Sequence, residues 1–163
     1  MQENKIVIRN ATVSTRILTN KDTSNILSLR RNSNDNNIEV EDLVYLVSAC
    51  KEGQDSIVTG IFVDEELAGA VDIDYFNGEL REYTYKFNPN THICLVIQNI
   101  TVKYKYRANG LAEDLIYTVV DKYKACQNKN IILIANTFIA TGEDFFKHIG
   151  FKRCFDRHVR EFI

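Results

Sequence analysis

The residues best suited to chemistry by type and spacing are Arg107, Gly110 and Ala112, which follow a run of apolar, largely β-branched residues. From Leu111 onward the apolar residues recur at helical spacing, which predicts a helix. The first turn of a helix has backbone N–H groups without intrahelical acceptors and lies at the positive end of the helix dipole. Gly110 leaves room for an anion, and Arg107 can donate two hydrogen bonds to phosphate oxygens. The stretch therefore predicts a phosphate site, although an ordinary strand, turn and helix would also explain it.

The pattern Arg-x-x-Gly-x-Ala resembles the pyrophosphate loop of the GNAT superfamily of N-acetyltransferases, which reads Gln/Arg-x-x-Gly-x-Gly/Ala. Two more segments resemble that family and occur in its order. The run Ile97-x-x-Ile-x-Val102 is similar to its central strand, and Phe145-Phe-Lys-His-Ile-Gly-Phe151 to its Phe-Tyr-x-x-x-Gly-Phe segment. The resemblance covers about residues 13–163 and is closest from 93 to 151.

The resemblance implies acetyl-CoA as the acyl donor. It also implies that the strand at 97–102 splays from the strand at 131–135, so that the pantetheine arm enters the opening between them and Asn136 substitutes for a pantetheine contact. The cofactor-binding residues implied in this way are Ile100, Thr101, Val102, Arg107, Ala108, Asn109, Gly110, Leu111, Ala112, Asn136 and Phe146.

The catalytic residues are less well defined by the resemblance. Gln98 stands where many members of the family have a glutamate base, and Phe146 stands where many have a tyrosine acid. Tyr104 and Tyr106 flank the loop and are, with Gln98, the weak candidates for a catalytic role; they could also simply cover the end of the helix. Because a thiolate is a tolerable leaving group, positioning of the two reactants can supply most of the rate, and Phe146 would then pack against the pantetheine arm.

The resemblance favours an acetyl-CoA-dependent N-acetyltransferase that acts on a primary amine, carried either by a small molecule or by a protein. Two alternatives stay open at this stage. The first is a catalytically weak or inactive GNAT-fold module that binds CoA or a partner protein. The second is a dinucleotide-binding domain, against which stands the absence of the first glycine of Gly-x-Gly-x-x-Gly around Gly110.

The length and composition of the chain limit its class. With 163 residues, 45% hydrophobic and 26% charged, we expect a single globular domain over residues 1–163. The net charge of −2 gives no basic excess for nucleic acid. No apolar run approaches the roughly 20 residues that span a bilayer, and no signal peptide is recognisable, so a cytoplasmic protein without a membrane partner is expected. A homodimer is left open.

Cysteine and histidine usage predicts neither metal binding nor a disulfide framework. The four cysteines form no Cys-x-x-Cys pair, and each is expected to be a small buried or half-buried residue. The histidines are isolated, so no metal ligand set is expected. His148 is expected on the surface.

The predicted elements define a fold class. Strands are expected over residues 5–9, 13–18, 56–63, 67–75, 80–87, 93–102, 131–135 and, as one or two strands, 151–163; helices are expected around 26–29 and over 39–51, from 111 onward and over 141–148. Asn77-Gly78 predicts a tight hairpin turn before the strand at 80–87. The order predicts a mixed α/β fold of the GNAT type: a mostly antiparallel sheet with a parallel, splayed central pair and helices on both faces.

Overall fold

The computed structural model describes residues 8–30, 38–52, 54–76, 87–136, 142–154 and 157–163. The chain forms two compact units: unit 1 comprises Met1–Asp72 and Asn99–Ile116, and unit 2 comprises Ile73–Gln98 and Tyr117–Ile163. The strand expected at 5–9 and the one expected at 80–87, with its Asn77-Gly78 turn, lie largely outside the described residues. The described strands are hydrogen-bonded in the order β1-β2-β3-β4-β5-β7-β6.

Unit 1 contains three neighbouring antiparallel strands. Its strands are β1 (Val13–Ile17), β2 (Val58–Val63) and the first part of β3 (Glu66–Tyr75). Asp64 and Glu65 join β2 to β3, and both have left-handed backbones, with φ of 47° and 69°. A two-residue turn of this kind matches the twist of the strands that it connects, so β2 and β3 form a tight hairpin.

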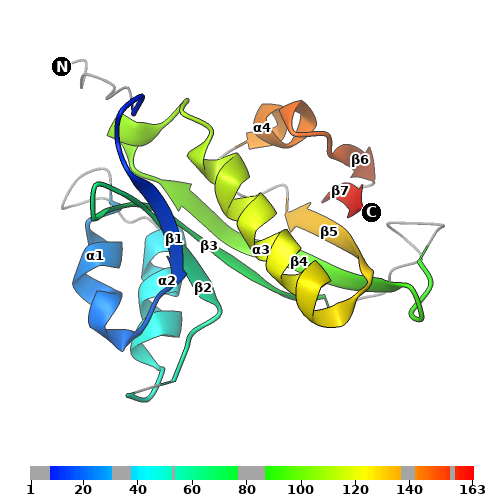
Figure 1. Ribbon diagram of the computed structural model, residues 1–163, viewed down its shortest axis with the longest axis horizontal. Helices are drawn as coiled ribbons and strands as arrows, with labels where there is room; N and C mark the ends of the chain where they lie inside the picture. Colours follow the sequence, from blue (N-terminus) through cyan, green and yellow to red (C-terminus); the bar gives the residue numbers. More distant parts are fainter. Residues whose placement is uncertain (1–7, 31–37, 53, 77–86, 137–141, 155–156) are drawn as a thin grey trace. The chain divides into compact units, whose positions relative to one another are not determined.

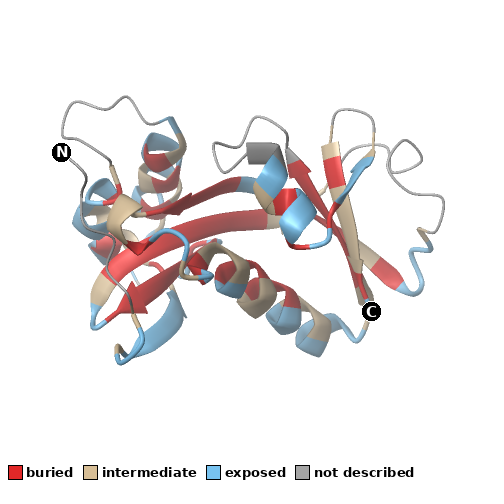
Figure 2. Cartoon of the chain, turned by 90° about the horizontal axis from the view of Figure 1, so that it is seen from above, coloured by how far each residue is buried: buried red, intermediate tan, exposed pale blue. Residues whose placement is uncertain are grey.

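Helices cover both faces of the strands in unit 1. The 3-10 helix η1 (Asn20–Asp22) leads into α1 (Thr23–Leu27), and α1 packs beside α2 (Ile38–Ser48) on one face (Figure 1). The first turns of α3 (Leu111–Gln127) lie on the other face (Figure 2). The core under α1 and α2 consists of Leu18, Ile26, Leu29, Val40, Leu43, Val47, Val58, Phe62, Leu67 and Ala70. Val44 and Leu46 of α2 are partly buried and pack against this cluster.

Unit 2 contains the parallel pair that the sequence predicts. In it, residues 92–97 of β4 (His92–Val102) run parallel to β5 (Asn130–Asn136), and β7 (Arg157–Phe162) pairs antiparallel with both β5 and β6 (Lys152–Cys154). Residues 131–135 are all buried, as expected for a strand covered on both faces. The C-terminal segment therefore forms two strands.

Two helices contact the same face of β7 in unit 2. On α3, the Tyr117 ring lies edge-on to Phe162, with centroids 6.0 Å apart. On α4 (Gly142–His148), the Phe146 ring stacks on His158 at 5.8 Å. Gly150 has a φ of 89°, and its N–H donates to the Lys147 carbonyl, so α4 ends at His148, where the helix expected over 141–148 also ends.

Two expectations need correction. The helix expected over 39–51 ends at Ser48, because the Cys50 N–H donates to the Val47 carbonyl, at 3.2 Å, in a tighter 3-10-type turn. Cys126 is exposed on the last turn of α3 rather than half-buried, although Cys94 is buried as expected. Within the described part of the chain, no helix is long and apolar enough to cross a membrane.

Candidate functional site

The loop between β4 and α3 has an unusual backbone. After the 3-10 helix η3 (Tyr104–Tyr106), Arg107 is extended, and Ala108 and Gly110 both have left-handed φ angles, of 63° and 78°. The first α3 hydrogen bond runs from the Asp114 N–H to the Gly110 carbonyl, at 3.0 Å. The N–H groups of residues 111–113 therefore belong to the first turn, where a helix supplies no acceptor. An exposed loop leads directly to these donors.

Gly110 leaves open space beside the start of this helix. A Cβ built on Gly110 would have no heavy atom within 4 Å outside its chain neighbours and the helix backbone. Packing against the protein therefore does not require a glycine here, whereas the φ of 78° favours one. Ala112, in the first turn, is half-buried and small. A group of phosphate size could approach the N–H groups from this open side.

Arg107 has a second role besides the one predicted. Its side chain is exposed, but its Nε donates to the Val102 carbonyl at 3.0 Å, and its guanidinium carbon lies 5.6 Å from the centre of the Tyr104 ring. A bidentate contact through Nε is thereby excluded. The two terminal nitrogens can still contact an anion end-on, so Arg107 both ties the loop to β4 and supplies positive charge.

A carboxylate that the sequence did not single out holds the start of the loop. Glu66, the first residue of β3, accepts hydrogen bonds from the Lys103 and Lys105 ammonium groups, at 2.6 and 2.7 Å, and from the Tyr106 hydroxyl at 2.5 Å. Burial raises the pKa of Glu66, but the hydrogen bonds from Lys103, Lys105 and Tyr106 outweigh it and lower the pKa to about 2. We call these four residues the Glu66 cluster.

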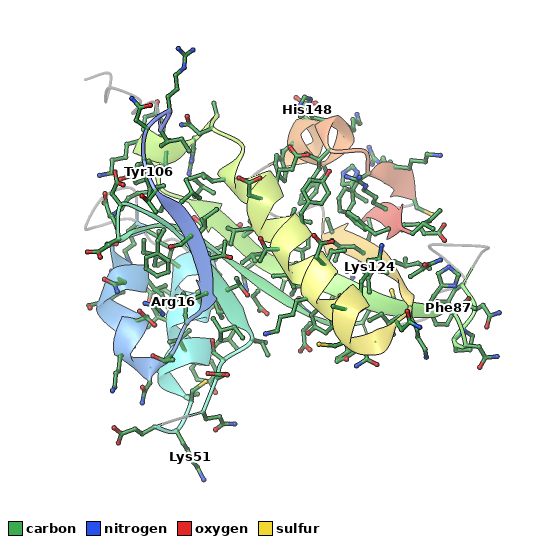
Figure 3. All side chains as sticks on the ribbon, viewed as in Figure 1. Arg16, Lys51, Phe87, Tyr106, Lys124 and His148 are labelled. Atoms are coloured by element: carbon green, nitrogen blue, oxygen red, sulfur yellow. The ribbon has the colours of Figure 1, made fainter. Side chains whose placement is uncertain are left out.

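The cluster defines where the two loop tyrosines lie. Tyr106, labelled in Figure 3, lies in the short helix η3 that precedes the loop. It is 5% exposed, and its pKa is raised, first by burial and then by its hydrogen bond to Glu66. A buried phenol with a raised pKa that already donates to a carboxylate is poorly suited to protonate a leaving group. Tyr104 is half-buried and faces Arg107. This geometry favours a supporting role for both.

The last part of β4 extends beyond its partner. Pairing of β4 with β5 ends at Ile97 and Ala135, whereas β4 continues to Val102. Among the described residues, β5 itself ends at Asn136, one residue after its last pair with β4. Ile100, Thr101 and Val102 are buried as whole residues, so none of them presents a side chain to solvent.

Gln98 is the one exposed residue of β4. Since the last β4–β5 pair is formed by Ile97, Gln98 lies at the first position beyond that pair. Its amide can hydrogen-bond a ligand but cannot accept a proton at neutral pH, so the glutamate base of the resembled family has no equivalent at this position.

Two of the predicted cofactor-binding residues, Asn136 and Phe146, lie in unit 2. Asn136 ends β5 and is paired with Arg157 on β7. Phe146 is 1% exposed and packs between Phe151, at 5.2 Å, and His158. With so little accessible surface, Phe146 can influence a ligand mainly through the packing of α4. His148 is exposed on the same helix, as predicted (Figure 3).

Metal ligands do not gather in the described parts of the chain. No group of three or more His, Cys, Asp or Glu residues there could hold a metal ion. His92 is instead structural, because one ring nitrogen lies 2.9 Å from Glu161 and the other lies at the same distance from Thr91. The loop between β4 and α3 therefore remains the strongest candidate for a site.

Comparisons with known proteins identify the fold. No protein-family model and no curated protein matches the sequence. Among solved structures, a GNAT family acetyltransferase from Brucella melitensis in complex with acetyl-CoA has a TM-score of 0.58 at 13% identity, over 93% of this chain and 89% of that one. NAA60 of Arabidopsis thaliana in complex with acetyl-CoA has a TM-score of 0.61 at 19% identity, over 93% and 100%.

A third structure agrees. The PaiA N-acetyltransferase of Thermoplasma acidophilum, in complex with coenzyme A, has a TM-score of 0.55 at 16% identity, over 92% of this chain and 98% of that one. The chain therefore has the GNAT fold, as the loop motif predicted. The three matches extend over nearly the full length of both proteins.

Proposed function

We propose that this protein is an acetyl-CoA-dependent N-acetyltransferase that transfers an acetyl group to a primary amine. The observation that supports this most is the open space at Gly110, next to N–H groups at the start of α3 and to the exposed Arg107. A GNAT fold with this loop fits the pyrophosphate of CoA. Acetyl-CoA and CoA are bound in the similar structures, which adds support for the donor.

The described residues suggest a division of labour within unit 1. The N–H groups of residues 111–113 and the terminal nitrogens of Arg107 would bind the pyrophosphate. The backbone of Ile100, Thr101 and Val102, at the end of β4, would orient the pantetheine amides. Acetyl-CoA supplies an activated thioester when bound. A nearby N–H could polarise its carbonyl, and alignment with the amine would contribute most of the rate.

A catalytically weak CoA-binding module is the second candidate, and two residues favour it. Gln98 cannot serve as the base, and the buried Phe146 carries no hydroxyl. The two candidates share the donor site and differ only in turnover. We favour the enzyme because neither a dedicated base nor a dedicated acid is essential when the amine is already neutral and the leaving group is a thiolate.

One experiment separates the candidates. Calorimetric titration with acetyl-CoA, CoA, NAD and ATP should show binding of the first two alone, and thiol release should then be measured against a panel of amines that includes polyamines, amino acids and peptides with free N-termini. Thiol release above the rate without amine supports the enzyme. Tight CoA binding without release for any amine supports the module. Preference for NAD or ATP would contradict both.

A further inference from the structure

We propose that Glu66 is a positioning residue for the segment between β4 and α3, residues 103–110, which we call the phosphate loop. Glu66 holds residues 103–107 in place, so that Arg107 and the N–H groups at the start of α3 can contact the pyrophosphate at the same time. The inference rests on the proposed function and adds to it a residue of β3, far from the loop in sequence. It concerns unit 1 only, in which every contact of the argument lies.

The contacts of Glu66 leave the start of the loop little freedom. Its Oε1 accepts from Lys103, and its Oε2 accepts from both Lys105 and Tyr106. One carboxylate thus contacts three of the four residues that precede Arg107. The Lys105 ammonium also lies 4.8 Å from the centre of the Tyr106 ring, which joins the members of the Glu66 cluster to one another.

A second set of hydrogen bonds connects these residues to Arg107 and Asn109. The Tyr106 carbonyl accepts from the Asn109 side-chain amide at 3.1 Å, and the Arg107 N–H donates to the Tyr104 carbonyl at 3.2 Å. Asn109 immediately precedes Gly110. A displacement of Tyr106 would therefore be passed to the residues that carry the anion-binding N–H groups.

Glu66 is itself on a fixed support. The preceding turn residue Asp64 donates its N–H to the Thr12 carbonyl and accepts from the Thr12 N–H through its side chain, both at 2.9 Å. Close by on β3, the Ala68 carbonyl accepts from the Lys103 N–H at 2.7 Å. The β2–β3 hairpin and the loop are thus joined by backbone as well as by side chains.

The charge of Glu66 argues for positioning rather than attraction. A carboxylate near an anion site lowers the positive potential there, so it opposes the binding of phosphate through space. Glu66 neutralises part of the charge of Lys103 and Lys105. Positioning and long-range attraction therefore predict opposite effects when the charge is removed, and this makes the proposal testable by sign.

The test compares Glu66→Gln with Glu41→Gln, a matched control on α2. Glu41 is also paired with a basic residue, Arg30, and its side chain is 52% exposed against 37% for Glu66. We expect Glu66→Gln to weaken the binding of CoA and acetyl-CoA about tenfold and to leave pantetheine binding within about twofold. Glu66→Asp, which keeps the carboxylate, should weaken CoA binding less than Glu66→Gln does. Glu41→Gln should leave all three ligands unchanged.

Three results of the binding measurements would overturn the proposal. These are tighter CoA binding by Glu66→Gln, unchanged CoA binding, and an equal loss for CoA and pantetheine. Amide hydrogen exchange of the ligand-free proteins provides a readout that does not depend on the function. Faster exchange over residues 103–114 in Glu66→Gln than in Glu41→Gln supports positioning, and equal exchange contradicts it. If the parent protein fails to bind CoA, the proposed function is wrong, and this exchange result still decides whether Glu66 orders the loop.

Discussion

Ala108 and Gly110 both have left-handed backbones in the loop that leaves space for a ligand. Both have left-handed φ angles, but only Gly110 can adopt its angle without crowding a Cβ. Because Ala108 is exposed, packing of its side chain does not offset the conformational free energy that its backbone costs. The left-handed region costs a non-glycine residue roughly 1–2 kcal/mol. The two positions therefore allow conformational cost and ligand access to be separated.

We expect Gly110→Ala to fold, to lose about 1 kcal/mol of stability from strain, and to weaken acetyl-CoA binding tenfold or more because its Cβ occupies the open space. Ala108→Gly should instead change stability by less than about 1 kcal/mol and keep binding within a few-fold. Urea unfolding and calorimetric titration measure the two effects. Unchanged affinity in Gly110→Ala would remove the loop from the donor site.

Phe146 illustrates how burial changes an expectation from sequence. A tyrosine at this position could protonate the leaving thiolate in the resembled family, so Phe146→Tyr would be a natural gain-of-function variant. In the structure the ring is 1% exposed and lies against Phe151 and His158. An added hydroxyl would have to be accommodated inside this aromatic cluster, where an unsatisfied polar group is costly.

We therefore expect Phe146→Tyr to lose about 1–3 kcal/mol of stability and to change the thiol-release kcat by no more than a few-fold. Phe145→Tyr is the control, because the Phe145 side chain is only half-buried and should accept a hydroxyl at little cost. Thermal unfolding and steady-state kinetics provide the two readouts. Unchanged stability together with a kcat that rises 100-fold would show that the hydroxyl reaches the reacting atoms.

At the scale of elements, the turn that joins β1 to α1 depends on one buried carboxylate. Asp22 accepts two hydrogen bonds from the Arg16 guanidinium, at 2.8 and 2.7 Å, and one from the Thr19 N–H at 2.9 Å. The hydrogen bond from Arg16 contributes most to lowering the Asp22 pKa well below its ordinary value. The ionised form is thus favoured in the folded protein.

This predicts a pH-dependent stability with a defined sign. Because the folded pKa is lowered, the stabilisation by Asp22 is fully present above its unfolded pKa of about 3.9 and is lost as the pH falls toward the folded value. Asp22→Asn should therefore cost about 1–3 kcal/mol at pH 7 and less at pH 3. Urea unfolding at the two pH values tests this. An equal difference at pH 7 and pH 3 would show that the charge of Asp22 is irrelevant.

At the scale of the whole molecule, the architecture agrees with what local patterns predict. The apolar stripe expected from residue 111 is observed, since Leu111, Leu115, Ile116, Val119 and Val120 are buried and Ala112 and Tyr123 are half-buried. The β4–α3–β5 order requires a parallel pair, and β4 and β5 form one. Periodicity and turn chemistry suffice here because each element buries its own apolar face.

The sequence by itself determined the strand, loop and helix of the candidate site and, through the motif Arg-x-x-Gly-x-Ala, the fold. Only the tertiary structure revealed Glu66, whose partners lie 37, 39 and 40 residues away in the chain. It also showed that the Arg107 Nε donates to the Val102 carbonyl and that the Phe146 side chain is buried. Local spacing predicts which face of an element is apolar, but the partner of a side chain depends on which distant elements the folded backbone brings together.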